Sequence, residues 1–390
     1  MNIVCSFASR VRFVRVGILV SLLCVLCASV VNSPAQDFKT IHDGVEYAEV
    51  TRKLGDDPVK INLLRLDLTK VRLDVHHAMD AAIGTEKTSS MAIRKSAVAA
   101  INAGFFRLDT SIFAGDAAGI LKIDRVPLSE PISKRIAIFI DNRSEATIVA
   151  FDHLETRSWV EIKKRELTIS GINRERKDNE LIEYTPEFGQ TTFTSPEGIE
   201  VIIRRNRIAE IRVGSSSSGI PADGFVLSAS GTRREEILKW LKIGQKVTRL
   251  TAVSANPGSD FSPPSYGFED ITNGVPQLIK DGKIDITWEQ EKSSKSFVET
   301  RHPRTAVAKM KDGKFLMITV DGRQPGVSVG MNLNELAEYL LSLGAVDAMN
   351  LDGGGSTTMF LDGKVVNKPS DKEGERKVGD AILVSLRKKK

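Results

Sequence analysis

The stretch that decides the fold is residues 315–359, FLMITVDGRQPGVSVGMNLNELAEYLLSLGAVDAMNLDGGGSTTM. Two apolar runs within it, Phe315–Val320 and Val346–Leu351, predict buried strands. Between them Asn332 and Glu335 have the spacing of a helix capping box. The apolar residues that follow recur at helical spacing, at Leu333, Leu336, Ala337, Leu340 and Leu341. The order strand, helix, strand predicts a right-handed crossover that joins two parallel strands.

Each of these two strands is followed directly by an aspartate, Asp321 and Asp352. Parallel strands end at the same edge of a sheet, so we expect both carboxylates at one carboxyl-terminal edge, where such sheets bind ligands. Each aspartate is also half of an Asp-Gly pair, and such pairs commonly form simple turns. A functional role for these two pairs is favoured over a simple turn, because polar or glycine-rich sequence follows each pair, rather than a returning strand.

The second aspartate opens a glycine-rich segment that can bind an anion. Gly353, Gly354 and Gly355 are followed by Ser356 and Thr357. Consecutive glycines let backbone N–H groups approach an anion without obstruction by a Cβ atom. The segment is not a Walker loop, because the lysine of that motif is absent.

Three other side chains are candidates for substrate binding. Arg304 precedes a further strand and can supply the guanidinium fork that grips a phosphodiester. Arg323 lies two residues after Asp321, where a structural ion pair is equally compatible with the sequence. Asn102 follows an apolar strand, and its amide can bind a sugar or cap a turn.

The remaining pattern predicts an α+β fold: a mixed β-sheet core with a βαβ crossover near the C-terminus and several hairpins. The hairpin signals are three Asp-Gly turns between apolar runs, at 281–282, 312–313 and 362–363. Residues 36–95 form an N-terminal strand-rich region expected to pack on the main domain, and residues 96–390 form that domain.

Residues 1–35 resemble an export signal. Arg10, Arg12 and Arg15 precede the apolar run Val16–Val31, and small residues follow at Ser33-Pro34-Ala35. A retained membrane anchor is the alternative, since the run is near the lower limit for spanning a bilayer. We expect cleavage, a periplasmic or secreted protein, and no stable membrane span after processing.

The amino-acid composition also limits the kinds of chemistry that the chain can perform. All three cysteines, Cys5, Cys24 and Cys27, lie in this first segment, so thiol catalysis and disulfides are excluded from the processed chain. Removal of the three arginines lowers the formal charge from +5 to +2, which gives no support for nucleic-acid binding. No zinc motif is present, and the sequence requires no cofactor.

Several blocks together resemble the phosphodiester glycosidase domain family, which bacterial exported proteins share with the lysosomal enzyme that removes N-acetylglucosamine from a phosphodiester. The resemblance covers roughly Ala97 to Val384. Its blocks, in chain order, are Asn102–Phe106, Thr272–Pro276, Arg301–Ala306, Val320–Gln324, Asn350–Met359 and Val366–Asp371.

The resemblance implies hydrolysis of a sugar-1-phosphodiester in an envelope or extracellular glycan. It implies Asp321 and Asp352 as catalytic residues, with Asn102, Arg304, Arg323, Gly353–Ser356 and Thr357 binding substrate. A divalent cation, Ca²⁺ or Mg²⁺, that bridges an aspartate to phosphate is compatible with this site. Two alternatives stay open: a metal-dependent phosphodiesterase, and a non-catalytic glycan-binding protein of the cell envelope.

Overall fold

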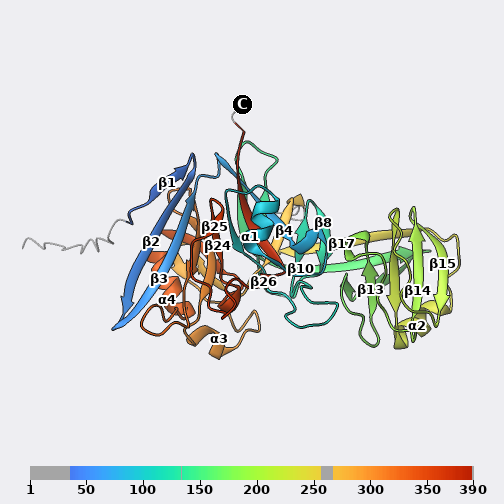
Figure 1. Cartoon of the computed structure of the whole chain (residues 1–390). Coiled ribbons are helices and arrows are strands. Elements are labelled where there is room, and N and C mark those ends of the chain that lie inside the picture. Colours follow the sequence, from blue (N-terminus) through green and yellow to red (C-terminus); the bar gives the residue numbers. More distant parts are fainter. Residues whose placement is uncertain (1–35, 133, 256–266, 389–390) are drawn as a thin grey trace, which may run out of the picture. The chain divides into compact units, whose positions relative to one another are not determined.

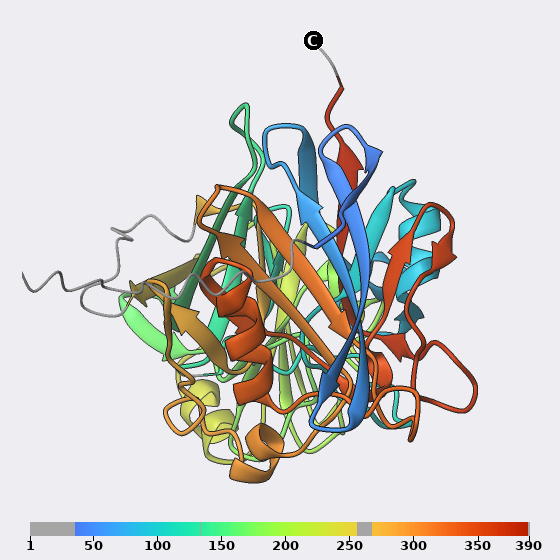
Figure 2. The same cartoon turned by 90° about the vertical axis from the view of Figure 1, so that its left-hand side faces the viewer.

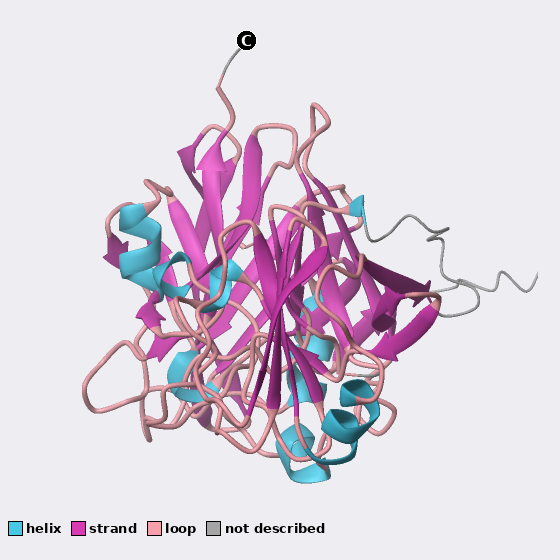
Figure 3. Ribbon diagram, turned by 90° about the vertical axis from the view of Figure 1, so that its right-hand side faces the viewer, coloured by secondary structure: helices cyan, strands magenta, loops and turns pink. Residues whose placement is uncertain are grey.

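The computed structural model describes residues 36–132, 134–255 and 267–388, and the expected export signal lies outside them. Strands dominate the described chain, and its helices are few and short (Figure 3). In the described part of the chain, every helix is too short or too polar to span a bilayer.

The largest sheet has eight strands, in which each neighbouring pair is antiparallel. Its spatial order is β1 (Lys39–His42), β2 (Val45–Leu54), β3 (Asp57–Leu66), β22 (Phe315–Val320), β21 (Arg304–Met310), β23 (Ala345–Asn350), β19 (Gln277–Lys280) and β20 (Lys283–Ile284).

Two further sheets complete the main body. One has the order β25 (Lys364–Val365), β24 (Met359–Leu361), β6 (Ala99–Asn102), β27 (Asp380–Leu386) and β4 (Val71–His77). The other has the order β11 (Arg165–Thr168), β10 (Ile148–Ile162), β9 (Ile136–Asp141), β18 (Asp270–Asn273), β7 (Leu121–Ile123) and β8 (Val126–Ser129), with β17 (Val247–Ala255) also paired to β10.

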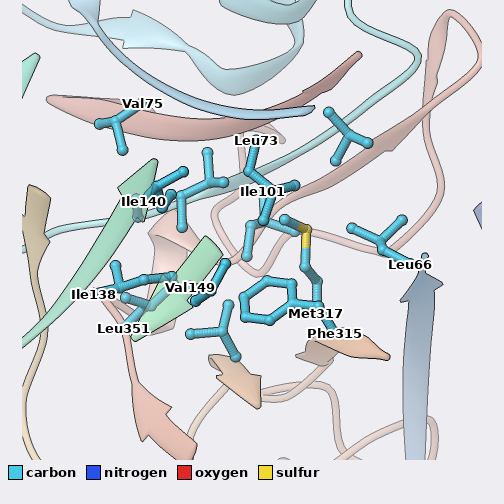
Figure 4. Close-up of a cluster of buried hydrophobic side chains, with 14 of the residues drawn as sticks. Leu66, Leu73, Val75, Ile101, Ile138, Ile140, Val149, Phe315, Met317 and Leu351 are labelled. Carbon is cyan, nitrogen blue, oxygen red and sulfur yellow. The ribbon is translucent and has the colours of Figure 1, made fainter. Parts of the chain in front are cut away.

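A single apolar core joins these three sheets. Phe315 and Met317 of the eight-stranded sheet, Ile101 of the second sheet and Ile138 of the third belong to the same buried cluster (Figure 4). Leu351, the residue before Asp352, belongs to it as well and is fully buried. The chain that leads into the predicted site is therefore fixed by core packing.

The predicted helix is α4 (Leu333–Ser342), and it begins with the predicted capping box at Asn332 and Glu335. Its apolar residues pack on the other face of the eight-stranded sheet, beside the orange strands in Figure 2. Strands β22 and β23 are both antiparallel to β21, which lies between them, so they run in the same direction and end at the same edge.

Residues between β10 and β17 form a separate module. It contains β12 (Gly171–Ile172), β13 (Leu181–Tyr184), β14 (Ile199–Arg204), β15 (Arg207–Val213), β16 (Gly224–Ala229) and α2 (Gly231–Leu238). The long strands β10 and β17 connect the module to the main body (Figure 1), and it has its own apolar core. Only β12 and β13 among the paired strands are parallel in the described chain.

The short elements are β5 (Glu86–Lys87), which pairs with β26 (Lys377–Val378), the helices α1 (Thr88–Arg94) and α3 (Lys295–Glu299), and 3-10 turns at Ala78–Asp80, Pro186–Phe188 and Gly354–Ser356.

All three predicted Asp-Gly turns are confirmed, since each joins an antiparallel pair of strands. The mixed, sheet-rich fold is confirmed at this coarse level. Residues 36–95 add strands to the main sheets, through β3 beside β22 and β4 beside β27.

The packing of α4 predicts that substitutions on its two faces change the free energy of unfolding by different amounts. Leu336 is fully buried in the core behind the eight-stranded sheet, whereas Glu338 is exposed. We expect Leu336→Ala to lower the free energy of unfolding by about 2–5 kcal/mol, because it leaves a cavity. Glu338→Ala should change it by less than about 0.5 kcal/mol. Equal losses in urea unfolding would contradict this packing.

Candidate active site

The predicted residues collect at one edge, where several strands of two sheets end or begin. Asp321 follows β22, and Asp352 follows β23 after one residue. Backbone hydrogen bonds join this edge: Asp352 N–H donates to Ala103 O at 2.9 Å, and Gly354 N–H donates to Pro303 O at 2.9 Å. The glycine-rich segment is therefore held against the end of β6 and the start of β21.

Asn102 is completely buried and connects three segments at this edge. Its Nδ2 donates to the Asp352 carbonyl at 2.6 Å. Its Oδ1 accepts from the Thr305 hydroxyl at 2.8 Å and from the Thr358 N–H at 3.1 Å. Since both ends of the amide are occupied, Asn102 positions the site instead of facing solvent.

Asp321 is also a buried connector, with 3 % of its surface exposed. Its carboxylate accepts hydrogen bonds from Asn367 Nδ2 at 3.2 Å and from the Lys368 N–H at 3.1 Å. Asn367 in turn donates to Thr357 O and accepts from Met359 N–H. Burial raises the pKa of the Asp321 carboxyl. The geometry thus ties Asp321 to the chain just after the glycine-rich segment.

Arg304 is 1 % exposed, and most of its guanidinium is used within the protein. Nε donates to Met331 O at 2.9 Å, and Nη2 donates to the carbonyls of Phe297 and Thr300 at 2.8 Å. Nη1 has no partner among the described residues. Burial lowers the pKa of Arg304 to about 10. One nitrogen, rather than a two-nitrogen fork, is left for a ligand.

Two other arginines lie against the glycine-rich segment. A Cβ atom on Gly354 would lie 3.0 Å from Arg323 Nη2, and one on Gly355 would collide with the Arg376 guanidinium. Arg376 also forms a bidentate pair with Asp371, at 2.7 and 3.0 Å. The glycines are needed here because guanidinium groups occupy the space of a side chain.

The backbone N–H groups of the segment are mostly engaged. Gly353 N–H donates to the Asp352 carboxylate at 2.9 Å, and Ser356 N–H donates to Gly353 O at 3.2 Å. Gly354 N–H is held by Pro303, as described above. An anion bound here would therefore meet chiefly the two guanidinium groups. The buried Thr357 hydroxyl has no partner within the described chain and would be a further donor.

Asp352 is the half-buried carboxylate beside these arginines. Burial raises its pKa to about 6. The Ser356 hydroxyl lies near enough to oppose this shift, although its geometry completes no hydrogen bond. The Gly353 N–H and the Arg376 charge oppose the shift as well. Asp352 is therefore ionised at neutral pH but has a proton affinity suited to acid–base chemistry.

A second carboxylate near Asp352 was not predicted. Asp380, at the start of β27, is buried and accepts hydrogen bonds from Gly104 N–H at 2.8 Å and from the Thr272 hydroxyl at 2.5 Å. Burial raises the pKa of Asp380, and its charge contributes to the raised pKa of Asp352. In the sequence, only the apolar run that follows Asp380 could have indicated this residue, because it belongs to no recognisable motif.

His302 was also missed, although it lies in a block that we singled out. Arg323 Nη2 lies 3.4 Å from His302 Nδ1. Burial lowers the pKa of His302, reinforced by the charges of Arg304 and Arg323. Because a guanidinium can only donate, Nδ1 accepts and the neutral ring carries its proton on Nε2.

Metal binding stays a prediction. Within the ranges that the structure describes, no three His, Cys, Asp or Glu side chains are grouped so as to hold a metal ion.

The contact between Gly354 and Arg323 predicts a specific substitution effect. Gly354 has a φ of 62°, and Gly363 has a φ of 82° with open space around it. Alanine at either position should cost about 1–2 kcal/mol of stability in urea unfolding, because both positions are left-handed. Only Gly354→Ala should weaken binding of inorganic phosphate in calorimetric titration, roughly tenfold, by displacing a charged donor. Equal affinities of the two variants would contradict the role of this contact.

Several known proteins resemble this chain in sequence or in fold. A sequence model described as "Phosphodiester glycosidase" matches residues 197–385. The N-acetylglucosamine-1-phosphodiester alpha-N-acetylglucosaminidase of Mus musculus is 32 % identical over 168 residues, 40 % of this chain and 31 % of the mouse protein. The enzyme of the same name from Homo sapiens is 36 % identical over 175 residues, 43 % of this chain and 30 % of the human protein.

The chain thus spans about a third of the length of these relatives. A solved structure of a Synechocystis protein has the same fold, with a TM-score of 0.76 and 22 % identity, covering 91 % of this chain and 64 % of that one. Residues 197–385 of this chain are therefore similar in sequence to the phosphodiester glycosidase family.

Proposed function

We propose that this protein hydrolyses the bond between a sugar and phosphate in a sugar-1-phosphodiester. The observation that carries the proposal is the arrangement at the glycine-rich segment: the guanidinium groups of Arg323 and Arg376 lie against Gly354 and Gly355, next to the Asp352 carboxylate. Cationic donors and a carboxylate with a raised pKa are what a negatively charged glycoside requires. The mouse and human relatives are named for an activity on a sugar-1-phosphodiester, which supports the same reaction.

The phosphate side of the reaction needs charge neutralisation more than proton donation. A departing phosphate monoester has a second pKa near about 6, so it leaves at neutral pH without a strong general acid. Arg323 and Arg376 would bind its oxygens through charge-assisted hydrogen bonds. Arg376 would use Nη1, because Asp371 already occupies Nε and Nη2. His302, neutral and protonated on Nε2, would donate a further hydrogen bond.

The sugar side of the reaction is assigned to Asp352. Its carboxylate would take a proton from the water that attacks the anomeric carbon, while the bond from that carbon to the phosphate oxygen breaks and the phosphate keeps the electron pair. Direct attack by the carboxylate, followed by hydrolysis, is the retaining version of the same chemistry. Asp380, which is buried, would act on this step only through its charge, which raises the pKa of Asp352.

The buried predicted residues take a positioning role in this proposal. Asn102 holds the Asp352 backbone, and Asp321 holds Asn367 and with it the chain after the glycine-rich segment. Arg304 joins β21 to the segment that contains α3. We further propose that the protein is exported, on the basis of residues 1–35, and acts on an envelope or extracellular glycan.

The pKa of Asp352 predicts both activity and stability as functions of pH. If the carboxylate acts as base or nucleophile, kcat/KM for a sugar-1-phosphodiester rises with pH through about 6 and then levels off. Asp352→Asn should lower kcat by roughly 10²- to 10⁴-fold and abolish that inflection. Asp56→Asn, in an exposed turn, should do neither. A wild-type rate that falls through pH 6 would instead assign Asp352 as an acid.

The free energy of unfolding as a function of pH tests the raised pKa of Asp352 without any measurement of turnover. The folded pKa of about 6 lies above the unfolded value of roughly 3.9, so ionisation of Asp352 disfavours the folded state. Wild type should therefore lose stability relative to Asp352→Asn as pH rises from about 4 to above 6. A constant difference across this range would contradict the raised pKa.

The bond that breaks can be identified with labelled solvent. When a sugar-1-phosphodiester is hydrolysed in oxygen-18 water, attack at the anomeric carbon places the label in the released sugar. We expect mass spectrometry to find it there. Label in the phosphate product would contradict the glycosidase reaction and indicate attack on phosphorus.

A further inference from the structure

A polar cavity lies between the main body and the module. It has a volume of about 590 Å³ and is lined by Arg107, Asp116, Arg174, Glu175, Lys177 and Glu180. Arg107 and Asp116 come from the loop between β6 and β7, and the other four from the segment between β12 and β13. The volume lies within the range of about 300–1,000 Å³ that is usual for small-molecule sites.

The charges of this lining balance one another. Three side chains are cationic and three are carboxylates. Arg107 pairs with Glu175 at 2.6 Å, and Arg174 pairs with Glu180 at 2.8 Å. A ligand with a single strong charge would therefore meet as much repulsion as attraction, whereas a neutral ligand with many hydroxyl groups can donate to the carboxylates and accept from the cations.

Two of the lining side chains are available to bind a ligand. The Asp116 carboxyl accepts no hydrogen bond from any residue in the described ranges, and Lys177 forms no salt bridge there. Burial, with the charge of Glu130, raises the pKa of Asp116 to about 7. The carboxylate oxygens of Asp116 can therefore accept hydrogen bonds from the hydroxyl groups of a ligand.

The cavity is connected to the candidate active site by a short, well-held stretch of chain. Asn102 bonds to Asp352, and two residues later Gly104 N–H bonds to Asp380. From Asn102 to Arg107 is five residues, which span at most about 17 Å. Arg107 N–H then donates to Asp116 O at 2.8 Å, which fixes the two sides of the loop to each other. A glycan a few sugar rings long can bridge this distance.

We propose that this cavity is a subsite for a neutral sugar unit of the glycan that carries the hydrolysed linkage. The module is then part of substrate recognition, and the natural substrate is an oligomeric or polymeric glycan phosphodiester instead of a small glycoside. This inference rests on the proposed function for its biological role, but the binding of neutral sugar can be measured without turnover.

The test is calorimetric titration of the full chain with neutral tetrasaccharides of glucose and of N-acetylglucosamine. We expect one of them to bind in saturable fashion, and Asp116→Asn to weaken that binding about tenfold through loss of a carboxylate acceptor. Lys177→Ala, at an exposed position that should not disturb folding, should weaken it as well. Asp178→Asn, the same chemical change at an exposed neighbour outside the lining, should leave it unchanged.

The outcomes separate this inference from the proposed function. Absence of saturable binding by either tetrasaccharide, or binding that neither Asp116→Asn nor Lys177→Ala weakens, overturns the subsite. Binding as expected, together with no cleavage of any sugar-1-phosphodiester, supports the subsite and overturns the hydrolase. If the protein has both the subsite and the hydrolase activity, Asp116→Asn should reduce its preference for a tetrasaccharide phosphodiester over a phosphodiester of a single sugar.

Discussion

The site depends on one buried side chain, the amide of Asn102, which must satisfy all its hydrogen bonds without water. It joins the Asp352 carbonyl, the Thr305 hydroxyl and the Thr358 N–H, which lie 250, 203 and 256 residues from Asn102 in the sequence. A buried amide left without such partners costs roughly 1–3 kcal/mol. The same requirement fixes where the glycine-rich segment enters and leaves, because Asp352 and Thr358 flank it on either side.

With its two ends fixed, the segment is shaped by what lies against it. Arg323 and Arg376 occupy the space next to Gly354 and Gly355, and any larger residue there would displace a guanidinium group. Two kinds of residue thus make up the site. Buried connectors set the backbone, and half-exposed charged groups beside the glycines can reach a ligand. The reaction that we propose uses the second kind and depends on the first for its geometry.

Much of this arrangement could be predicted from local patterns. Helical spacing with a capping box identified α4, and Asp-Gly turns identified three hairpins, because these signals lie within a few residues. Burial could not be predicted in this way. Asp321 and Arg304 were expected to touch substrate, but tertiary contacts with Lys368 and Met331 occupy most of their polar atoms. Asp380 was missed since its proximity to Asp352 arises only from sheet pairing.

The central claim is that an anion binds between the two guanidinium groups at the glycine-rich segment. The most direct test is a crystal structure of the protein soaked with a sugar 1-phosphate. We expect the phosphate oxygens within hydrogen-bonding distance of Arg323 and Arg376, with the anomeric carbon towards the Asp352 carboxylate. Phosphate bound instead at the basic groove formed by Arg72, Arg143 and Lys388, with this segment empty, would contradict the account.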